Sequence, residues 1–207
     1  VVSTKELIDK KTLSDFNIKA LVLTYPEAEC KLVKDMNYQD EMDYIVSHKG
    51  RNKFICDLTL RLKSNTLVLF QYVEKHGKIL YDMINSETDR KVFFVYGGTD
   101  TQTREDIRAI TEGEKDAIII ASYGTFSTGI NIRNLHNIMF ASPSKSRVRA
   151  LQSIGRGLRR SESKDTATLF DLADDFTYKS KKNFTINHFL ERINIYAEEE
   201  FNYEINR

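Results

Sequence analysis

The sequence is poor in cysteine and proline, and each shortage excludes a class of protein. Its two cysteines, Cys30 and Cys56, lie far apart without a second pair. This excludes a disulfide scaffold and a zinc knuckle and favours a reducing cytoplasm. Two prolines and 9 glycines among 207 residues exclude collagen-like and linker sequences. A net charge of +1 with 41% apolar residues excludes general disorder.

Long apolar runs and targeting signals are also missing. Apolar runs such as 117–121 are about five residues long, against about 20 for a membrane span. The N-terminus, VVSTKELIDKK, has no apolar signal-peptide region and no initiator methionine. We therefore expect a piece of a longer, cytoplasmic chain without a membrane partner. Four histidines without ligand spacing predict structural roles, so no metal site is expected.

Short apolar runs alternate with amphipathic stretches through most of the chain. The expected strands cover 20–25, 66–71, 91–96, 116–121, 137–142 and 167–172. The expected helices are two within 35–63 that break near Gly50, then 74–86, 101–112, 145–160 and 184 to about 203. Apolar strands that alternate with helices predict a parallel sheet covered on both faces. The sequence therefore predicts an α/β fold with a mostly helical N-terminal extension and a C-terminal helix.

Helical spacing predicts which side chains face the core. The expected inward residues are Met42, Ile45, Val46, Phe54, Leu58, Leu62, Ile79, Leu80, Met83, Ile84, Phe189, Ile193 and Tyr196. We expect a core domain at 64–176, a linker and extension at 1–63, and a C-terminal amphipathic helix at 177–207.

The ends of the expected strands are the first candidates for a site, because ligands bind outside the carboxyl ends of parallel strands. Gly97-Gly98-Thr99 offers bare backbone N–H groups to a phosphate, and 122–129 is rich in hydroxyl groups. Each loop alone is weak evidence, since paired glycines usually mark a plain turn. Their placement on successive strands of one sheet favours a shared site.

A basic stretch follows the fifth expected strand. Six basic residues and no acid lie between Pro143 and Ser161: Lys145, Arg147, Arg149, Arg156, Arg159 and Arg160. Arg156 and Arg159 share a helix face with Gln152, one turn earlier. Gly155 and Gly157 each cost about 1 kcal/mol of helix stability, which indicates close approach to this backbone. Two planar guanidinium groups suit a transferring γ-phosphoryl group, whereas a solvated basic face is the alternative.

Several of these segments resemble motifs of superfamily-2 helicases. QSIGRGLRR at 152–160 is similar to motif VI, Gln-x-x-Gly-Arg-x-x-Arg; 122–131 resembles motif V; and 67–72 resembles motif IV. Gly97-Gly98-Thr99 followed by Arg104 resembles the glycine-and-arginine segment between motifs IV and V. Over about 66–172 the chain thus resembles the second RecA-like lobe of this superfamily. The preceding sequence, STKELIDKKTLSDFNIKALVLTYP, is similar to its phage members.

The resemblance implies a role for individual residues. It implies that Arg159 is the arginine finger, that Arg156 contacts the γ-phosphate, and that Gln152 couples the nucleotide to the cleft between lobes. Gly129 and Asn131 are implied beside the ribose, and Asn131 stands where motif V has an acid. The residues implied along the nucleic-acid backbone are Gln71, Tyr72, Gly98, Thr99, Ser122 and Thr125.

The sequence has no G-x-x-x-x-G-K-[ST] phosphate loop. ATP with Mg²⁺ is therefore expected to be bound mainly by an N-terminal lobe of the same polypeptide, and this chain alone is expected to be inactive. The resemblance implies a DNA-binding, ATP-dependent helicase that unwinds and branch-migrates single-stranded or branched intermediates of recombination, repair and stalled replication.

Two other functions remain open at this point. One is a non-catalytic nucleic-acid-binding module that kept the fold, and the other is a lobe of an RNA-remodelling ATPase. Residues 35–63 are expected to pack against the partner lobe. The C-terminal helix either binds DNA or docks on the other lobe.

Overall fold

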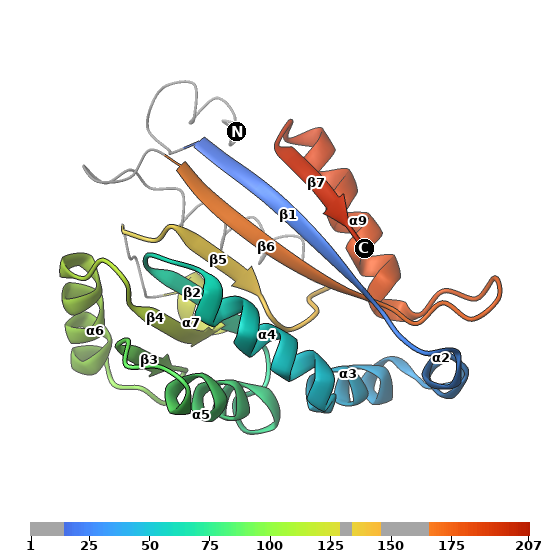
Figure 1. The fold of residues 1–207 in the computed structure, drawn as a ribbon, viewed down its shortest axis with the longest axis horizontal. Coiled ribbons are helices and arrows are strands. Elements are labelled where there is room, and N and C mark those ends of the chain that lie inside the picture. The colour runs from blue at the N-terminus through green and yellow to red at the C-terminus, as the bar shows by residue number, and fades with distance from the viewer. Residues whose placement is uncertain (1–14, 129–133, 146–165) are drawn as a thin grey trace.

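The computed structural model describes residues 15–128, 134–145 and 166–207, and its centre is a seven-stranded sheet (Figure 1). The strands are β1 (Asp15–Thr24), β2 (Thr66–Phe70), β3 (Val92–Val95), β4 (Ile118–Ser122), β5 (Asn137–Phe140), β6 (Thr166–Asp175) and β7 (Asn202–Asn206). Their order across the sheet is β3-β4-β2-β5-β6-β1-β7, and every neighbouring pair is parallel.

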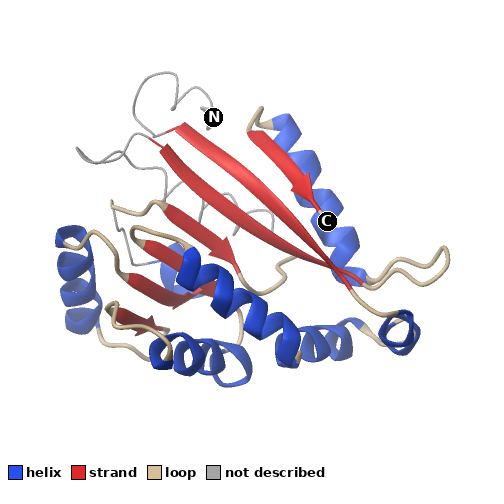
Figure 2. Ribbon diagram, viewed as in Figure 1, coloured by secondary structure: helices blue, strands red, loops and turns tan. Residues whose placement is uncertain are grey.

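Helices cover both faces of this sheet (Figure 2). They are α2 (Glu27–Val33), α3 (Tyr38–Ser47), α4 (Lys49–Arg61), the π-helical turn η1 (Val73–Gly77), α5 (Lys78–Ser86), α6 (Thr101–Gly113), α7 (Tyr123–Thr128) and α9 (Phe184–Glu198). One face packs against α4 and α5, whereas the other packs against α6, α7 and α9. The predicted α/β fold is confirmed.

Successive residues of the central strands belong to two different cores. In β2, Leu67 and Leu69 face α6 and α9, whereas Val68 and Phe70 face α4 and α5. Since a strand directs alternate side chains to opposite faces, two covered faces require apolar residues at every position. This is why the central strands are continuous apolar runs.

Two predicted core positions were wrong. Phe54 in α4 is 37% exposed and Ile79 in α5 is 39% exposed. In α4 the buried face instead includes the polar side chains of Arg51, Asn52 and Thr59. A prediction that places only apolar residues in the core therefore selects the wrong face of this helix. In α5 the apolar stripe is wider than the surface that the sheet covers.

The predicted C-terminal helix is too long, because it ends at Glu198 and the chain then forms β7 beside β1. Glu200 has φ 56°, and the N–H groups of Glu200 and Phe201 donate to the carbonyls of Ala197 and Tyr196 at 3.1 and 2.9 Å. This is the hydrogen-bond pattern of a Schellman cap, in which the left-handed residue is usually glycine. With glutamate there, the sequence carries no recognisable stop signal.

Most of the other expected elements overlap with those of the structure, although β1 begins five residues before the strand expected at 20–25 and α2 was not predicted. Asp100 accepts from the Thr103 N–H at 2.8 Å as the N-cap of α6. The break within 35–63 falls at His48, whose Nδ1 accepts from the Arg51 N–H at 3.0 Å as the N-cap of α4. The helix expected at 145–160 lies outside the described residues. Within the described ranges, no helix is long and apolar enough to cross a membrane.

Gly77 allows a close approach between the π-helical turn and β2. A Cβ atom at Gly77 would lie 2.6 Å from the ring of Phe70, which is fully buried. We therefore predict that Gly77→Ala lowers the free energy of unfolding by about 1–3 kcal/mol through overpacking. Urea unfolding checks this. Gly113→Ala is the control, because nothing lies within 4 Å of its Cβ position, and a similar loss there would contradict the explanation.

Candidate functional site at the carboxyl edge of the sheet

The loops that follow β2, β3, β4 and β5 lie along one edge of the sheet. These four strands are neighbours and parallel, so their carboxyl ends meet on the same side. The structure therefore brings together all six residues predicted along the nucleic-acid backbone: Gln71, Tyr72, Gly98, Thr99, Ser122 and Thr125.

The loop after β3 is a tight turn whose backbone faces solvent. The Thr99 N–H donates to the Tyr96 carbonyl at 2.9 Å, and its hydroxyl accepts from the Tyr96 N–H at 3.1 Å. A Cβ at Gly98 would lie 2.6 Å from the Tyr96 ring, whereas nothing lies within 4 Å of the position at Gly97. Glycine at 98 thus lets the tyrosine ring close over the turn. Gly97 and Gly98 are both exposed, as a contact to a phosphate requires.

Ser122 and Thr125 form a pair at the start of α7. Their hydroxyl oxygens are 2.7 Å apart, and the Thr125 N–H donates to the Ser122 hydroxyl at 3.3 Å. Thr125 is only 4% exposed, whereas Ser122 is half-buried. Of these two hydroxyl groups, that of Ser122 is therefore the accessible one, and Thr125 holds it by a hydrogen bond.

Tyr72 lies at the surface beside α3. Its hydroxyl accepts from Gln39 Nε2 at 3.3 Å, and the ammonium group of Lys75 lies 5.9 Å from the centre of its ring. Lys75 is in turn held by Asp43 at 2.9 Å. The ring therefore has a defined position at the edge of the sheet, where a base could stack on it.

Ser142 is a buried residue that was not predicted from the sequence, and it connects the loops after β2 and β4. Its hydroxyl accepts from the Gln71 N–H at 3.0 Å and lies 2.7 Å from His76 Nδ1. Its carbonyl accepts from the Tyr123 hydroxyl at 2.9 Å. On its other side, His76 Nε2 lies 3.1 Å from Asn52 Oδ1. We call Asn52, His76, Tyr123 and Ser142 the Ser142 hub.

The hydrogen bonds of the hub define the charge of His76. Asn52 Nδ2 donates to the Val46 carbonyl at 2.9 Å, so Asn52 Oδ1 accepts from His76 Nε2–H. Ser142 then donates to the bare Nδ1 while accepting from Gln71, which is the pattern of a neutral imidazole. Burial, with a smaller effect of the Arg51 charge, lowers the pKa of His76 well below its usual range.

The predicted nucleotide-binding residues lie outside the described part of the chain. These are Gly129, Asn131, Gln152, Arg156 and Arg159.

The structure does show how the start of the basic stretch is fixed. The Ser144 carbonyl accepts from Arg192 Nη1 at 3.0 Å, and Arg192 forms a two-bond ion pair with buried Asp171 at 2.8 and 2.9 Å. The Tyr196 hydroxyl also donates to Asp171 at 2.8 Å.

One group of possible metal ligands occurs among the described residues, but its chemistry does not suit a metal ion. Cys56, Asp57 and Glu87 bring their ligand atoms within 4.8 Å of one another. Lys53 already pairs with Asp57 and Glu87 at 2.6 and 3.3 Å. Burial raises the pKa of the Cys56 thiol to about 11, which disfavours the thiolate form that binds a metal.

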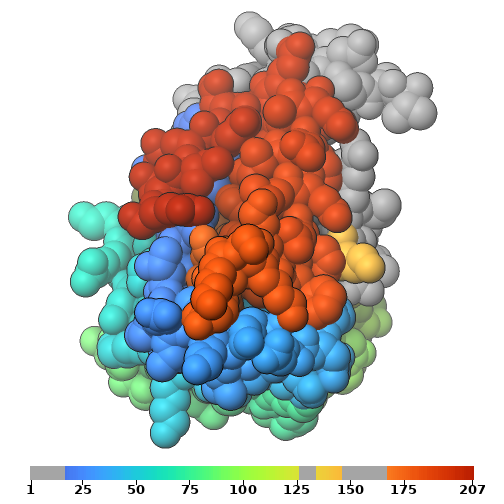
Figure 3. Space-filling view, turned by 90° about the vertical axis from the view of Figure 1, so that its right-hand side faces the viewer, coloured from blue at the N-terminus to red at the C-terminus, as the bar shows by residue number. Residues whose placement is uncertain are grey.

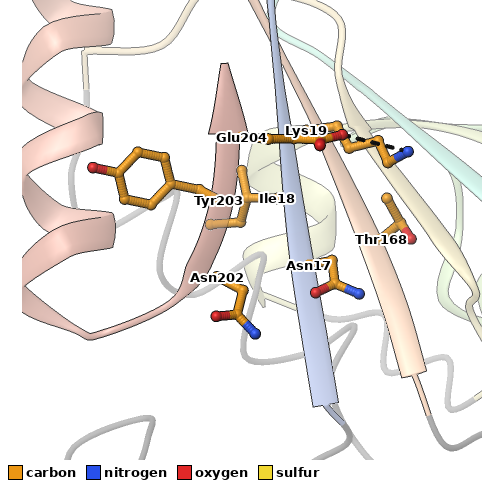
Figure 4. Close-up of a pocket in the computed structure, with 7 residues that line it drawn as sticks. All are labelled: Asn17, Ile18, Lys19, Thr168, Asn202, Tyr203 and Glu204. Atoms are coloured by element: carbon orange, nitrogen blue, oxygen red, sulfur yellow. Dashed lines mark ion pairs between the residues drawn. The ribbon is translucent and has the colours of Figure 1, made fainter. Parts of the chain in front are cut away.

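A separate groove of about 330 Å³ lies near the amino ends of β1 and β6 (Figure 4). Polar side chains of β1, β6 and β7 line it, and Lys19 pairs with Glu204 across it at 3.5 Å. None of the predicted site residues lines this groove. It is therefore distinct from the candidate site at the carboxyl edge.

Comparison with known proteins agrees with the geometry. The family described as helicase conserved C-terminal domain matches residues 50–161. The chain is 38% identical over 215 residues to the ATP-dependent DNA helicase uvsW of Enterobacteria phage T4, covering 98% of this chain and 42% of that protein. It is 25% identical over 173 residues to the putative ATP-dependent helicase IRC3 of Saccharomyces cerevisiae, covering 80% of this chain and 24% of that protein.

The same likeness is present in three dimensions. The crystal structure of T4 UvsW superposes with a TM-score of 0.81 at 38% identity, covering 94% of this chain and 42% of that one. The chain thus spans less than half the length of the relatives that it matches. The resemblance to the second lobe of superfamily-2 helicases is confirmed.

The neutral state of His76 predicts a dependence of stability on pH. The unfolded chain takes up a proton on this imidazole near pH 6.5, whereas the folded chain does not. The free energy of unfolding should therefore fall as the pH drops below 6.5, by up to about 1.4 kcal/mol per pH unit. Urea unfolding at a series of pH values, compared with His76→Gln, measures this contribution. Parallel curves for the two proteins would contradict it.

Proposed function

The chain belongs to the helicase conserved C-terminal domain family, and on that premise we propose that it is the second motor lobe of an ATP-dependent DNA helicase. The observation that carries the proposal is the carboxyl edge of the sheet. There the loops after β2, β3 and β4 follow neighbouring parallel strands, and Ser142 joins the loops after β2 and β4. In the sequence, Ser142 is followed directly by the basic stretch that contains Arg156 and Arg159.

The chemistry of the chain suits one half of a nucleotide site. Arg159 would act as the arginine finger, Arg156 would contact the γ-phosphate beside it, and Gln152 would link this contact to the cleft between lobes. Gly129 and Asn131 would lie at the ribose. Two guanidinium groups fit phosphate contact, whereas the chain has no phosphate loop to hold Mg²⁺. ATP with Mg²⁺ would thus be bound mainly by an N-terminal lobe of the same polypeptide, and this chain alone would not hydrolyse it.

The loops supply contacts of the kind that a DNA backbone accepts. Exposed backbone at Gly98, the hydroxyl groups of Thr99 and Ser122, and the amide and ring of Gln71 and Tyr72 form one row. Such contacts read no base sequence, which suits an enzyme that moves along DNA. In this proposal Thr125 acts through Ser122, because it is buried against that hydroxyl.

The substrate proposed is DNA, single-stranded or branched. The name of the phage relative, an ATP-dependent DNA helicase, supports DNA over RNA. Within this proposal, nucleotide hydrolysis drives a movement of the two lobes, and this movement shifts the enzyme along the bound DNA. The enzyme would in this way unwind and branch-migrate DNA intermediates of recombination, repair and stalled replication.

Removal of the proposed finger tests the catalytic role. In a protein that carries this chain together with a phosphate-loop lobe, Arg159→Ala should lower DNA-stimulated ATP hydrolysis by about 10³- to 10⁵-fold while DNA binding is retained. Steady-state hydrolysis and a binding titration measure the two properties. Arg108→Ala is the control, since Arg108 lies on α6 and pairs with Glu105 and Glu112. Unchanged hydrolysis in Arg159→Ala would instead favour a non-catalytic binding module.

The Ser142 hub predicts a second effect on the same enzyme. Ser142→Ala leaves the Gln71 N–H without its acceptor and should raise the DNA concentration needed for half-maximal stimulation several-fold, whereas hydrolysis without DNA changes little. Ser142→Thr keeps a hydroxyl and should restore part of the stimulation. Thr111→Val removes another buried hydroxyl, bonded to the Ile107 carbonyl at 2.7 Å, and controls for lost stability. An equal effect of Thr111→Val would contradict a positioning role for Ser142.

A further inference from the structure

A short basic turn projects from the carboxyl end of β6. Residues 177–182 read Thr-Tyr-Lys-Ser-Lys-Lys, and we call this segment the basic turn. Tyr178 and Lys181 exchange both backbone hydrogen bonds at 3.0 Å, and Lys179 between them has φ 53°. Residues 179–182 are all exposed. Figure 3 shows this segment in orange at the centre of the end face, next to the blue helices α2 and α3.

The base of the basic turn is held by buried hydrogen bonds. Asn183 is 5% exposed, its Oδ1 accepts from the Phe176 N–H at 3.0 Å, and its Nδ2 donates to the Asp174 carbonyl at 3.0 Å and to Glu41 at 2.8 Å. The carboxylate of Glu41, 1% exposed, also accepts from the N–H groups of Phe184 and Thr185 at 2.9 and 2.7 Å. The backbone of the turn therefore has a fixed position although its lysines are in solvent.

The charge at the turn is positive and incompletely neutralised. The ammonium groups of Lys34 and Lys179 lie 5.5 and 5.6 Å from the centre of the Tyr178 ring. Asp35 is within 4 Å of both Lys34 and Lys181. Within the part of the chain that the structure describes, Lys179 and Lys182 belong to no ion pair. Two ammonium groups thus remain available to an external anion.

The position of the turn relates it to the candidate site. β6 ends on the same edge as β2, β3 and β4, because all of these strands are parallel. Four strand spacings separate β3 from β6, which is about 19 Å. Helix α3 fills the interval, since Gln39 on α3 bonds to Tyr72 at 3.3 Å and Glu41 on α3 holds the base of the turn. Because β6 continues for four residues beyond its last pair with β5 at Asp171, the basic turn projects past the ends of those strands, on the far side of α3 (Figure 1).

We propose that the basic turn is a second contact for the phosphate backbone of DNA, beyond the loops after β2, β3 and β4. This inference rests on the proposed function. Lysine ammonium groups act as point charges that attract phosphates without fixed geometry, so this contact is independent of base sequence. The contact extends the DNA-binding surface across the whole carboxyl edge.

The test is the salt dependence of DNA binding by the double variant Lys179→Gln/Lys182→Gln. Binding of the full chain to a fluorescent single strand and to a duplex of the same length is measured over a series of salt concentrations. Loss of two phosphate contacts should reduce the slope of log affinity against log salt by about 1.4 for the single strand or about 1.8 for the duplex. The arm in which the slope falls identifies which form of DNA reaches the turn.

The matched control is Lys63→Gln/Lys115→Gln, which removes two exposed lysines next to the amino ends of β2 and β4. Its slopes should equal those of the wild type. Slopes of the Lys179/Lys182 variant that equal the wild type in both arms, or an equal reduction in the control, would overturn the inference.

A further variant, Gln71→Ala/Tyr72→Ala, separates this inference from the proposed function. If it weakens binding while the Lys179/Lys182 variant does not, the loops bind DNA and only the basic turn fails. If the wild-type chain binds neither oligonucleotide, both proposals fail.

Discussion

The arrangement of this lobe depends on two buried carboxylates in one strand. Asp171 and Asp174 lie near the carboxyl end of β6, on opposite faces of the sheet, and both are fully buried. Arg192 from α9 pairs with Asp171 at 2.8 Å, and Arg51 from α4 pairs with Asp174 at 2.7 Å. Breaking such a pair by removing one partner costs about 3–5 kcal/mol, because the remaining charge is left buried without compensation. The strand is thus fastened to one helix on each side.

Each of these ion pairs also forms a hydrogen bond with another segment at the carboxyl edge of the sheet. Arg192 also donates to the Ser144 carbonyl, where the basic stretch begins. The Tyr25 hydroxyl at the end of β1 donates to Asp174 at 2.6 Å, and burial together with this carboxylate raises the pKa of Tyr25. The carboxyl edge is therefore positioned by charge pairs as well as by apolar packing.

Much of the fold follows from local sequence patterns, since a strand with two covered faces is an apolar run and an amphipathic helix has its own period. These patterns do not reveal partners that are distant in sequence. Arg51 and Asp174 are 123 positions apart in the sequence, so the residues adjacent to Arg51 do not indicate that α4 buries this charged side chain. Glu200 similarly occupies a left-handed position without a glycine to mark it, and β7 was missed for that reason.

The same limit applies to the candidate site. The loops after β2, β3 and β4 could be predicted, because their glycines, hydroxyl groups and motif resemblance are local features. Ser142 could not be predicted, since its role comes from His76, 66 positions away, and from the Gln71 N–H, 71 positions away. A buried serine just after a strand has no local sequence feature that distinguishes it from a serine at the surface.

Glu41 has a mechanical consequence. By accepting four hydrogen bonds from Asn183, Phe184 and Thr185, this one carboxylate makes α3, the turn after β6 and the first turn of α9 a single stiff unit. Asn183 in turn bonds to the Asp174 carbonyl and to the Phe176 N–H, so a displacement of this unit also displaces the end of β6.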